Sequence, residues 1–188
     1  MSATPPPFVP LGFDALARWI DAEVEAEGTV LGLPLELMFR PAAADPLRLD
    51  LGGVVAATPF GLAAGPHGQL ATGIVAAWWC GARVVELKTL QHRAVEVLKP
   101  CIAMAGEGLN VELSQELGPE AALEGYLDAW VLVHALHARL GLAGPPGAVF
   151  DLSVGYDLEG LHHPVMQRVL TRARESGAEV ESRLRRLE

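Results

Sequence analysis

The segment from Thr58 to Thr89 constrains the fold more than any other part of the chain. It reads TPFGLAAGPHGQLATGIVAAWWCGARVVELKT and carries no formal charge before Arg83. Glycine and proline interrupt its first third, so no apolar stretch approaches the roughly 20 residues that a membrane span needs. Residues 69–80 favour a helix that ends at Gly81, and RVVELKT favours a strand. The segment therefore predicts a buried strand–helix–strand unit and no membrane span.

The rest of the chain continues this alternation of strands and helices. An amphipathic helix is expected over residues 13–27, a short turn over LELMF and a β-hairpin over residues 47–57. After a long extended connection, a helix over residues 120–140, a buried strand in AVFDLSVGY and a helix from His163 are predicted. The alternation favours a parallel α/β architecture. Because glutamates interleave with the late arginines, the end of the chain is expected to be a solvated helix face with a charged tail.

Composition excludes several classes of protein. The chain has 188 residues, of which 51% are hydrophobic, and a formal net charge of −9. This excludes a disordered chain and a basic nucleic-acid-binding surface. Cys80 and Cys101 have no metal-ligand spacing, and the start MSATPPPFVP does not resemble a secretory leader. Buried thiols in a cytoplasmic protein are therefore expected.

Two strand ends offer candidate ligand contacts. In a parallel α/β fold, binding sites gather at the carboxyl ends of the strands. The loop GLAAGPHG could expose its backbone to a flat ligand or an anion, or could simply be a tight turn packed against a helix. Lys88 follows apolar and β-branched positions, so it is either solvated at an edge or directed into a pocket, where it would offer its charge to an anion or a reduced cofactor.

The remaining candidates are less specific. Asn110 could pair with a ring that has N–H and C=O edges, or could cap a turn. Ser153, Tyr156 and Asp157 lie near the third strand end. The histidines are expected at ordinary positions, with His67 near enough to the glycine loop to reach a ligand; no metal site and no catalytic residue are predicted.

Several ordered segments resemble a known family. TPFGLAAG followed by a helix and VVELKT resembles the opening of the dihydroorotate dehydrogenase-like FMN enzymes. GLNVELSQE, GYLDAW and FDLSVGY are similar to the pyrimidine domain of dihydropyrimidine dehydrogenase. The closest resemblance, in AAGPH, ELKT, KPCI and SVGYDLEG, is to iron–sulfur flavoprotein subunits named selenate reductases. It extends from about Phe13 to about Gln167.

The resemblance implies a (β/α)₈ TIM barrel with FMN at its carboxyl-terminal face. The positions that match flavin contacts are Ala63, Ala64 and Gly65 in the first loop, and Lys88 and Thr89 after the second strand. Asn110 matches a substrate contact of dihydropyrimidine dehydrogenase, which implies a small substrate such as a nitrogen heterocycle.

The chain has only the first part of such a barrel, about three βα units preceded by a helix and a hairpin. We expect residues 1–46 to form a Pro-rich segment and helix, and residues 47–188 to form the partial FMN-type barrel. The family's catalytic loop, its FMN-phosphate loops and its iron–sulfur cysteines have no counterpart here. The chain would then be a fragment, a half that needs a partner, or a shortened protein, with a protein partner or self-association covering the open barrel edge. The alternative is a non-catalytic partner-binding or assembly subunit that keeps the half-barrel without cofactor.

Overall fold

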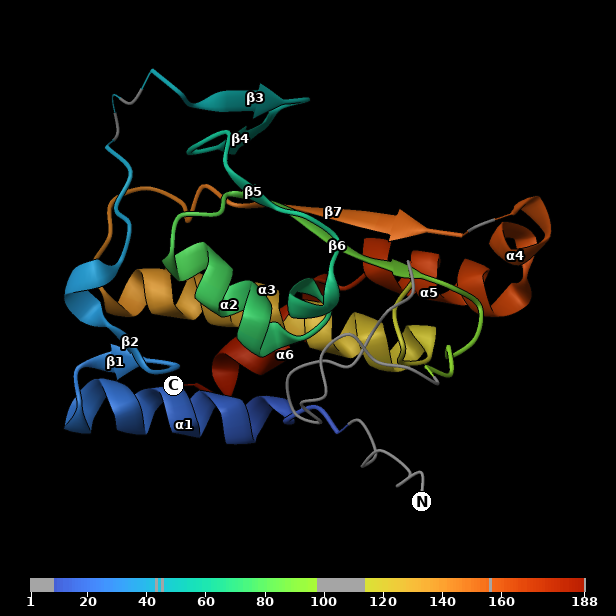
Figure 1. The fold of residues 1–188 in the computed structure, drawn as a ribbon, viewed down its shortest axis with the longest axis horizontal. Coiled ribbons are helices and arrows are strands. Elements are labelled where there is room, and N and C mark those ends of the chain that lie inside the picture. Colours follow the sequence, from blue (N-terminus) through green and yellow to red (C-terminus); the bar gives the residue numbers. More distant parts are fainter. Residues whose placement is uncertain (1–8, 43, 45, 98–113, 156, 188) are drawn as a thin grey trace.

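The computed structural model describes residues 9–42, 44, 46–97, 114–155 and 157–187. Figure 1 shows a short sheet with all the described long helices on one side of it. In chain order the elements are α1 (Phe13–Ala26), β1 (Thr29–Val30), β2 (Leu33–Pro34), η1 (Leu35–Leu37), β3 (Leu49–Leu51), β4 (Val54–Ala56), β5 (Gly61–Leu62), η2 (Pro66–Gly68), α2 (Ala71–Trp79), β6 (Val84–Leu90), α3 (Pro119–Arg139), β7 (Val149–Val154), α4 (Leu158–His162), α5 (Pro164–Arg174) and α6 (Gly177–Arg185).

The sheet has the order β5-β6-β7, and both of its strand pairs are parallel. The α/β class is therefore confirmed, and the described strands form an open part of a barrel. The first strand, which the sequence predicts as a buried strand over FGLAAG (residues 60–65), is much shorter in the structure. β5 contains only Gly61, which is exposed, and Leu62, which is half-buried. The predictions for the second and third strands agree with β6 and β7.

The hydrophobic core lies between the sheet and the helices. The largest part of α2, including Trp78 and Trp79, is fully buried, and α3 buries residues along most of its length. Both helices were predicted within two residues of their observed ends. Val85 and Leu87 of β6 belong to the same cluster as these helices. Strand alternation therefore places Glu86 on the opposite face, which no described helix covers (Figure 1).

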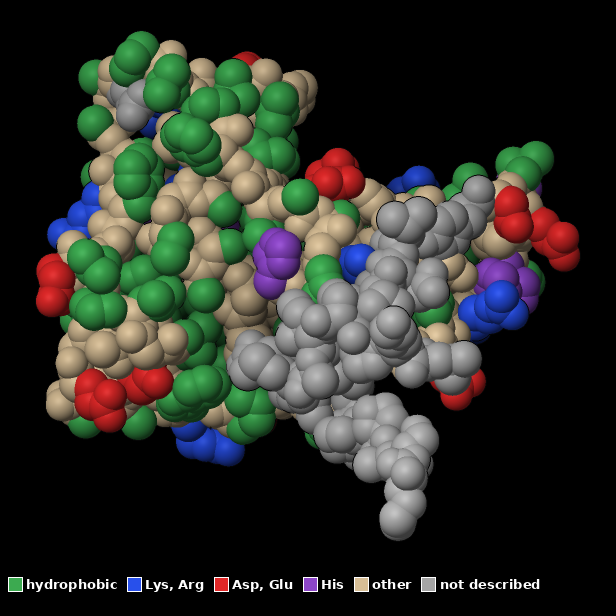
Figure 2. Space-filling view, in the orientation of Figure 1, with side chains coloured by type: hydrophobic (Ala, Val, Ile, Leu, Met, Phe, Trp, Pro, Cys, Tyr) green, Lys and Arg blue, Asp and Glu red, His purple; other side chains and the backbone are tan. Residues whose placement is uncertain are grey.

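The β3–β4 hairpin stands at the amino-terminal end of the sheet. Its strands pair antiparallel as predicted, and Figure 1 shows it on the side of the sheet away from the helices. Most of its apolar side chains are exposed, and Figure 2 shows hydrophobic side chains gathered over this part of the molecule. The exposed hydrophobic residues in and beside the hairpin are Leu47, Leu49, Leu51, Val54, Val55 and Phe60. We refer to these six residues as the hairpin patch.

Arg83 is a buried cation at the junction of α2 and β6. Its guanidinium donates to the carbonyls of Trp78 (2.6 Å), Ala82 (2.9 Å) and Phe39 (3.2 Å). Burial lowers the pKa of Arg83 to about 10, so it stays charged at neutral pH. A cation at the carboxyl-terminal end of α2 is favoured by the helix dipole. Arg83 therefore joins the linker after η1 to the end of α2.

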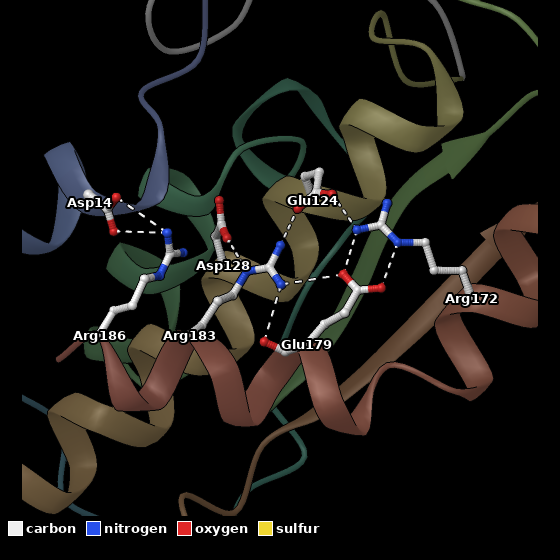
Figure 3. A network of polar contacts seen from close by, with 7 residues as sticks. All are labelled: Asp14, Glu124, Asp128, Arg172, Glu179, Arg183 and Arg186. Atoms are coloured by element: carbon white, nitrogen blue, oxygen red, sulfur yellow. Dashed lines mark hydrogen bonds and ion pairs between the residues drawn. The ribbon is translucent and has the colours of Figure 1, made fainter. Parts of the chain in front are cut away.

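The charged end of the chain is not a solvated tail. It forms α5 and α6, and ion pairs join both helices to α3 (Figure 3). Arg183 of α6 is buried and donates to Asp128 of α3 at 2.8 Å. Arg172 of α5 pairs with Glu124 of α3 and with Glu179 of α6. The interleaved charges therefore pair between helices, because α3 presents acidic side chains where these two helices pack.

Two smaller features also differ from the sequence predictions. Cys80 is exposed, because it is the residue that follows α2 at its carboxyl-terminal end. The short pair β1–β2 after α1 and the one-turn helix α4 were not predicted. Among the helices of the described residues, none combines the length and hydrophobicity that a bilayer span requires.

Candidate active site

The carboxyl ends of β5, β6 and β7 lie at one edge of the sheet, because the three strands are parallel. The segments that leave these ends are Ala63–Gly65, Gln91–Arg93 and Gly155 with Asp157. The structure thus brings the predicted first loop and the predicted second strand end to the same edge. Asn110 and Tyr156 lie outside the described residues, as does Cys101.

The loop after β5 is built from small residues in close contact with α2. An ideal Cβ at Gly65 would lie 2.8 Å from Cε1 of His67, and one at Gly73 would lie 1.8 Å from the His67 carbonyl oxygen. Glycine is therefore needed at Gly73, where the obstacle is backbone, whereas at Gly65 the exposed His67 ring can move aside. The contact at Gly73 agrees with a tight turn packed on a helix. Ala63 is exposed and Ala64 is half-buried, so the same loop also leaves flat, small-residue surface at the strand end.

Lys88 lies near the end of β6 and is only 3% exposed. The alternative of a lysine solvated at the sheet edge is therefore wrong. The pairing of β6 with β7 is irregular between Leu87 and Leu90, and Leu90 lies in the core, so the regular alternation that exposes Glu86 does not extend to Lys88. Thr89 is half-buried and forms a parallel bridge with Ser114, so a returning segment lies beside the strand end.

A buried polar network supports this strand end, and the sequence did not indicate it. The Tyr126 hydroxyl donates to the Lys88 carbonyl oxygen at 2.6 Å. The Gln115 amide donates both to Tyr126 (3.0 Å) and to the carbonyl oxygen of Gln69 (2.9 Å), and Gln69 donates to Glu116 (2.8 Å). Burial raises the pKa of Tyr126, so its hydroxyl keeps the proton that it donates. The network holds the loops around Lys88 in one arrangement.

Glu86 and Asp151 form an acidic pair on the uncovered face. They are register partners in neighbouring strands, and both are exposed. One carboxylate oxygen of Glu86 accepts the N–H of Ala64 at 3.3 Å, which links β6 to the first loop. The sequence contained a signal for this pair, since each acid stands between two apolar residues of its strand. The pair places negative charge immediately beside the Ala63–Gly65 loop.

The histidine and metal predictions can be compared with the described residues. His134 and His137 lie on α3, where burial lowers the pKa of each. His162, which the sequence predicted to be exposed together with His163, is exposed; His163 is half-buried and stacks on His92 with ring centroids 4.7 Å apart. In the described part of the chain, no group of three or more His, Cys, Asp or Glu side chains is placed to hold a metal ion.

Comparisons with a family model and with individual proteins point to the same family. A family model described as "Oxidoreductase YgfK, N-terminal TIM-barrel domain" matches residues 31–183. The chain is 37% identical over 163 residues to the protein named "Putative oxidoreductase YgfK" in Escherichia coli strain K12 and in E. coli O157:H7. The matched region covers 86% of this chain but 16% of each relative, so the chain spans about a sixth of the length of these proteins. No solved structure matches the chain.

Proposed function

Because the chain belongs to the family of the oxidoreductase YgfK N-terminal TIM-barrel domain, we propose that it forms the first part of an FMN-dependent oxidoreductase barrel. The barrel would be similar to those of dihydropyrimidine dehydrogenase and the selenate reductase flavoprotein subunits. One observation carries the proposal. A lysine that is almost fully buried ends the central strand beside a loop of small residues on the neighbouring strand.

The residues at this strand end support the proposal because the loop residues are small and the strand carries one positive charge. Ala63, Ala64 and Gly65 offer a surface without bulky side chains, and Lys88 and Thr89 offer a cation and a hydroxyl. FMN, when bound, would supply the electron-transfer chemistry. The role of Lys88 would be to stabilise negative charge on the reduced ring. Glu86 would oppose this effect, because the hydrogen bond from the Ala64 N–H holds its negatively charged carboxylate beside the same loop.

The proposal assigns the substrate contact to Asn110 and takes the substrate to be a small molecule such as a nitrogen heterocycle. It assigns no catalytic residue to this chain. The catalytic loop, the FMN-phosphate loops and any iron–sulfur clusters would belong to other parts of the oxidoreductase, which we place in the cytoplasm.

Flavin binding tests the proposal directly. FMN fluorescence would be titrated with the purified chain, alone and co-expressed with the E. coli segment that follows the matched region. We expect quenching by the wild type, at least tenfold weaker binding by Lys88→Met, and partial recovery in Lys88→Arg. Circular dichroism controls for folding of the variants. Unchanged FMN fluorescence with the wild type in both preparations would refute the flavin site.

A second candidate function is partner binding without a cofactor, and the hairpin patch favours it. Parallel sheets are normally covered on both faces, whereas here one face and the hairpin patch are exposed. We infer that the occupant of both surfaces is a polypeptide that carries the remaining βα units of the barrel. The length of the relatives supports this occupant, because 84% of each lies outside the matched region, from 100% less the 16% covered.

Size-exclusion chromatography with light scattering separates the two candidates. We expect a 1:1 complex with the co-expressed segment, and its loss in the double variant Leu51→Ser/Val54→Ser. Leu37→Ser is the matched control, because Leu37 is 67% exposed but lies outside the hairpin patch. A complex without flavin would support the partner-binding function alone. If the chain stays monomeric in the presence of the segment, or forms a homodimer, the inference that the remaining βα units cover these surfaces is wrong.

A further inference from the structure

A cavity of about 260 Å³ opens at the carboxyl ends of β6 and β7, and the proposed flavin contacts do not line it. Its lining residues are Gln91, His92, Arg93, Gly155, Asp157 and Gly160. We propose that this cavity binds a small zwitterion of the amino-acid type, with its carboxylate on Arg93 and its ammonium group on Asp157. The proposal does not rest on flavin binding.

The cavity contains two opposite charges that do not neutralise each other. Arg93 is exposed and forms no ion pair or hydrogen bond with another described residue. Asp157 lines the same cavity, yet no ion pair joins the two side chains. A guanidinium binds carboxylates through paired N–H donors, and a carboxylate accepts strong hydrogen bonds from cationic donors. A ligand with both charges would pair with Arg93 and with Asp157 at the same time.

Arginines that line other cavities of the described residues behave differently. Arg139 pairs with Asp21, and Arg168 pairs with Glu120 at 3.7 Å. Arg172 pairs with both Glu124 and Glu179. In this acidic protein, a cavity arginine thus usually has a carboxylate partner. Arg93 is left available for a ligand even though a carboxylate lies in the same cavity.

Contacts behind the cavity hold its walls in place. The Gln91 amide donates to the Ser114 hydroxyl at 3.0 Å, and His92 stacks on His163. The carboxylate of Asp157 accepts the Gly160 N–H at 2.6 Å, which fixes the side chain at the start of α4. Preformed walls reduce the entropy lost on binding.

Glycine and cavity size limit what can bind. An ideal Cβ at Gly160 would lie 3.0 Å from Oδ1 of Asp157 and 3.3 Å from Nδ1 of His92. Any side chain at this position would therefore crowd the space between those two walls. The volume is below the roughly 300–1,000 Å³ of sites for drug-sized ligands. The ligand is accordingly small, with its two charged groups separated by a short chain.

A series of ligands tests whether binding needs both charges and which spacing between them is preferred. Isothermal titration calorimetry would use the full chain without FMN, with glycine, β-alanine and 4-aminobutanoate as zwitterions and with butanoate and butylamine as singly charged controls. We expect one zwitterion to bind at least tenfold more tightly than either control. If no zwitterion binds, or if none binds more tightly than butanoate, the proposal is wrong.

Variants test the two assigned contacts. Arg93→Gln and Asp157→Asn should each weaken binding of the preferred zwitterion at least tenfold. Asparagine is also a good helix N-cap, so Asp157→Asn removes the charge and keeps the cap. Arg174→Gln is the matched control, since Arg174 is exposed and lies outside the cavity, and it should bind like the wild type. Equal binding by Arg93→Gln and the wild type would overturn the assignment. Because FMN is absent throughout, a failed flavin titration leaves this result unaffected.

Discussion

The two faces of the parallel sheet differ although the same strands form both. On the helical face, Val85 and Leu87 of β6 lie in a continuous core with α2 and α3. On the other face, Glu86 and Asp151 are exposed and lie in register on neighbouring strands. Alternation along one strand therefore separates two tasks. The first set of residues stabilises the chain, and Glu86 and Asp151 present their carboxylates to the surroundings of the chain.

The largest difference in stability is expected between an aromatic residue buried in the core and one exposed in the hairpin patch. Trp79 is fully buried under the sheet and its indole N–H donates to the Pro34 carbonyl at 3.3 Å. Trp79→Ala should lower the free energy of unfolding by about 3–5 kcal/mol, because it creates a cavity and leaves that carbonyl unpaired. Urea denaturation of the full chain measures this.

Phe60→Ala is the counterpart on the exposed side. Phe60 is 65% exposed in the hairpin patch, so its removal should change the free energy of unfolding by less than about 0.5 kcal/mol. A loss as large as that of Trp79→Ala would mean that the hairpin patch is covered in the isolated chain, and the contrast between the buried core and the hairpin patch would fail.

The buried arginine of α6 should have the next largest effect. Arg183→Met leaves Asp128 without its partner between α3 and α6 (Figure 3). Breaking a buried ion pair in this way costs about 3–5 kcal/mol, and the low end applies because Glu124 is partly exposed and can be solvated. The control is Arg185→Met, because Arg185 pairs with Glu181 on the surface and such pairs contribute about 0–1 kcal/mol. Similar losses in the two variants would show that the α6 network stabilises the helical layer no more than a surface pair.

The sequence predicted the helical face better than the open one. Periodicity located α1, α2 and α3, since each buries a regular set of apolar residues. The strand VVELKT was found because it is rich in apolar and β-branched residues. The β5 prediction was too long, because small residues such as Ala63 and Ala64 look apolar in sequence whether or not a neighbour covers them.

The candidate site was predictable only in part. Lys88 and the glycine loop could be found because a charge or a glycine run at a strand end is unusual. Gln69, Gln115 and Tyr126 could not, since their role depends on contacts between segments that are far apart in the chain. The same holds for α6. Its arginines are typical of a solvated helix until Asp128 is seen to face Arg183.

The pH dependence of stability should come in part from the helical layer. Burial lowers the pKa of His137, and the nearby Arg83 charge adds to this effect. The folded state then binds a proton less readily than the unfolded state, whose histidine titrates near pH 6.5. The stabilising contribution is complete above that pH and is lost as the pH falls through the lower folded-state pKa.

Denaturation at pH 7.5 and pH 5.0 measures this loss. The decrease between the two values should be smaller for His137→Gln than for the wild type. His162→Gln should leave the decrease unchanged, because His162 is exposed. An unchanged decrease in His137→Gln would exclude His137 as a source of the pH dependence.

The smallest effect is expected from the acidic pair on the open face. In the isolated chain, Glu86→Gln should change the free energy of unfolding by less than about 0.5 kcal/mol, since surface substitutions rarely do more. The change should be stabilising, because Glu86 and Asp151 are like charges in register on neighbouring strands. Val85→Ala, one residue away on the same strand, removes two buried methyl groups and should cost more than 1 kcal/mol.

Burial of the open face by the remaining βα units would desolvate Glu86 and raise the cost of its charge. Glu86→Gln should therefore strengthen the complex more than it stabilises the isolated chain, unless the partner supplies a cation. A weaker complex with Glu86→Gln would show that such a cation exists and that the acidic pair is part of the interface.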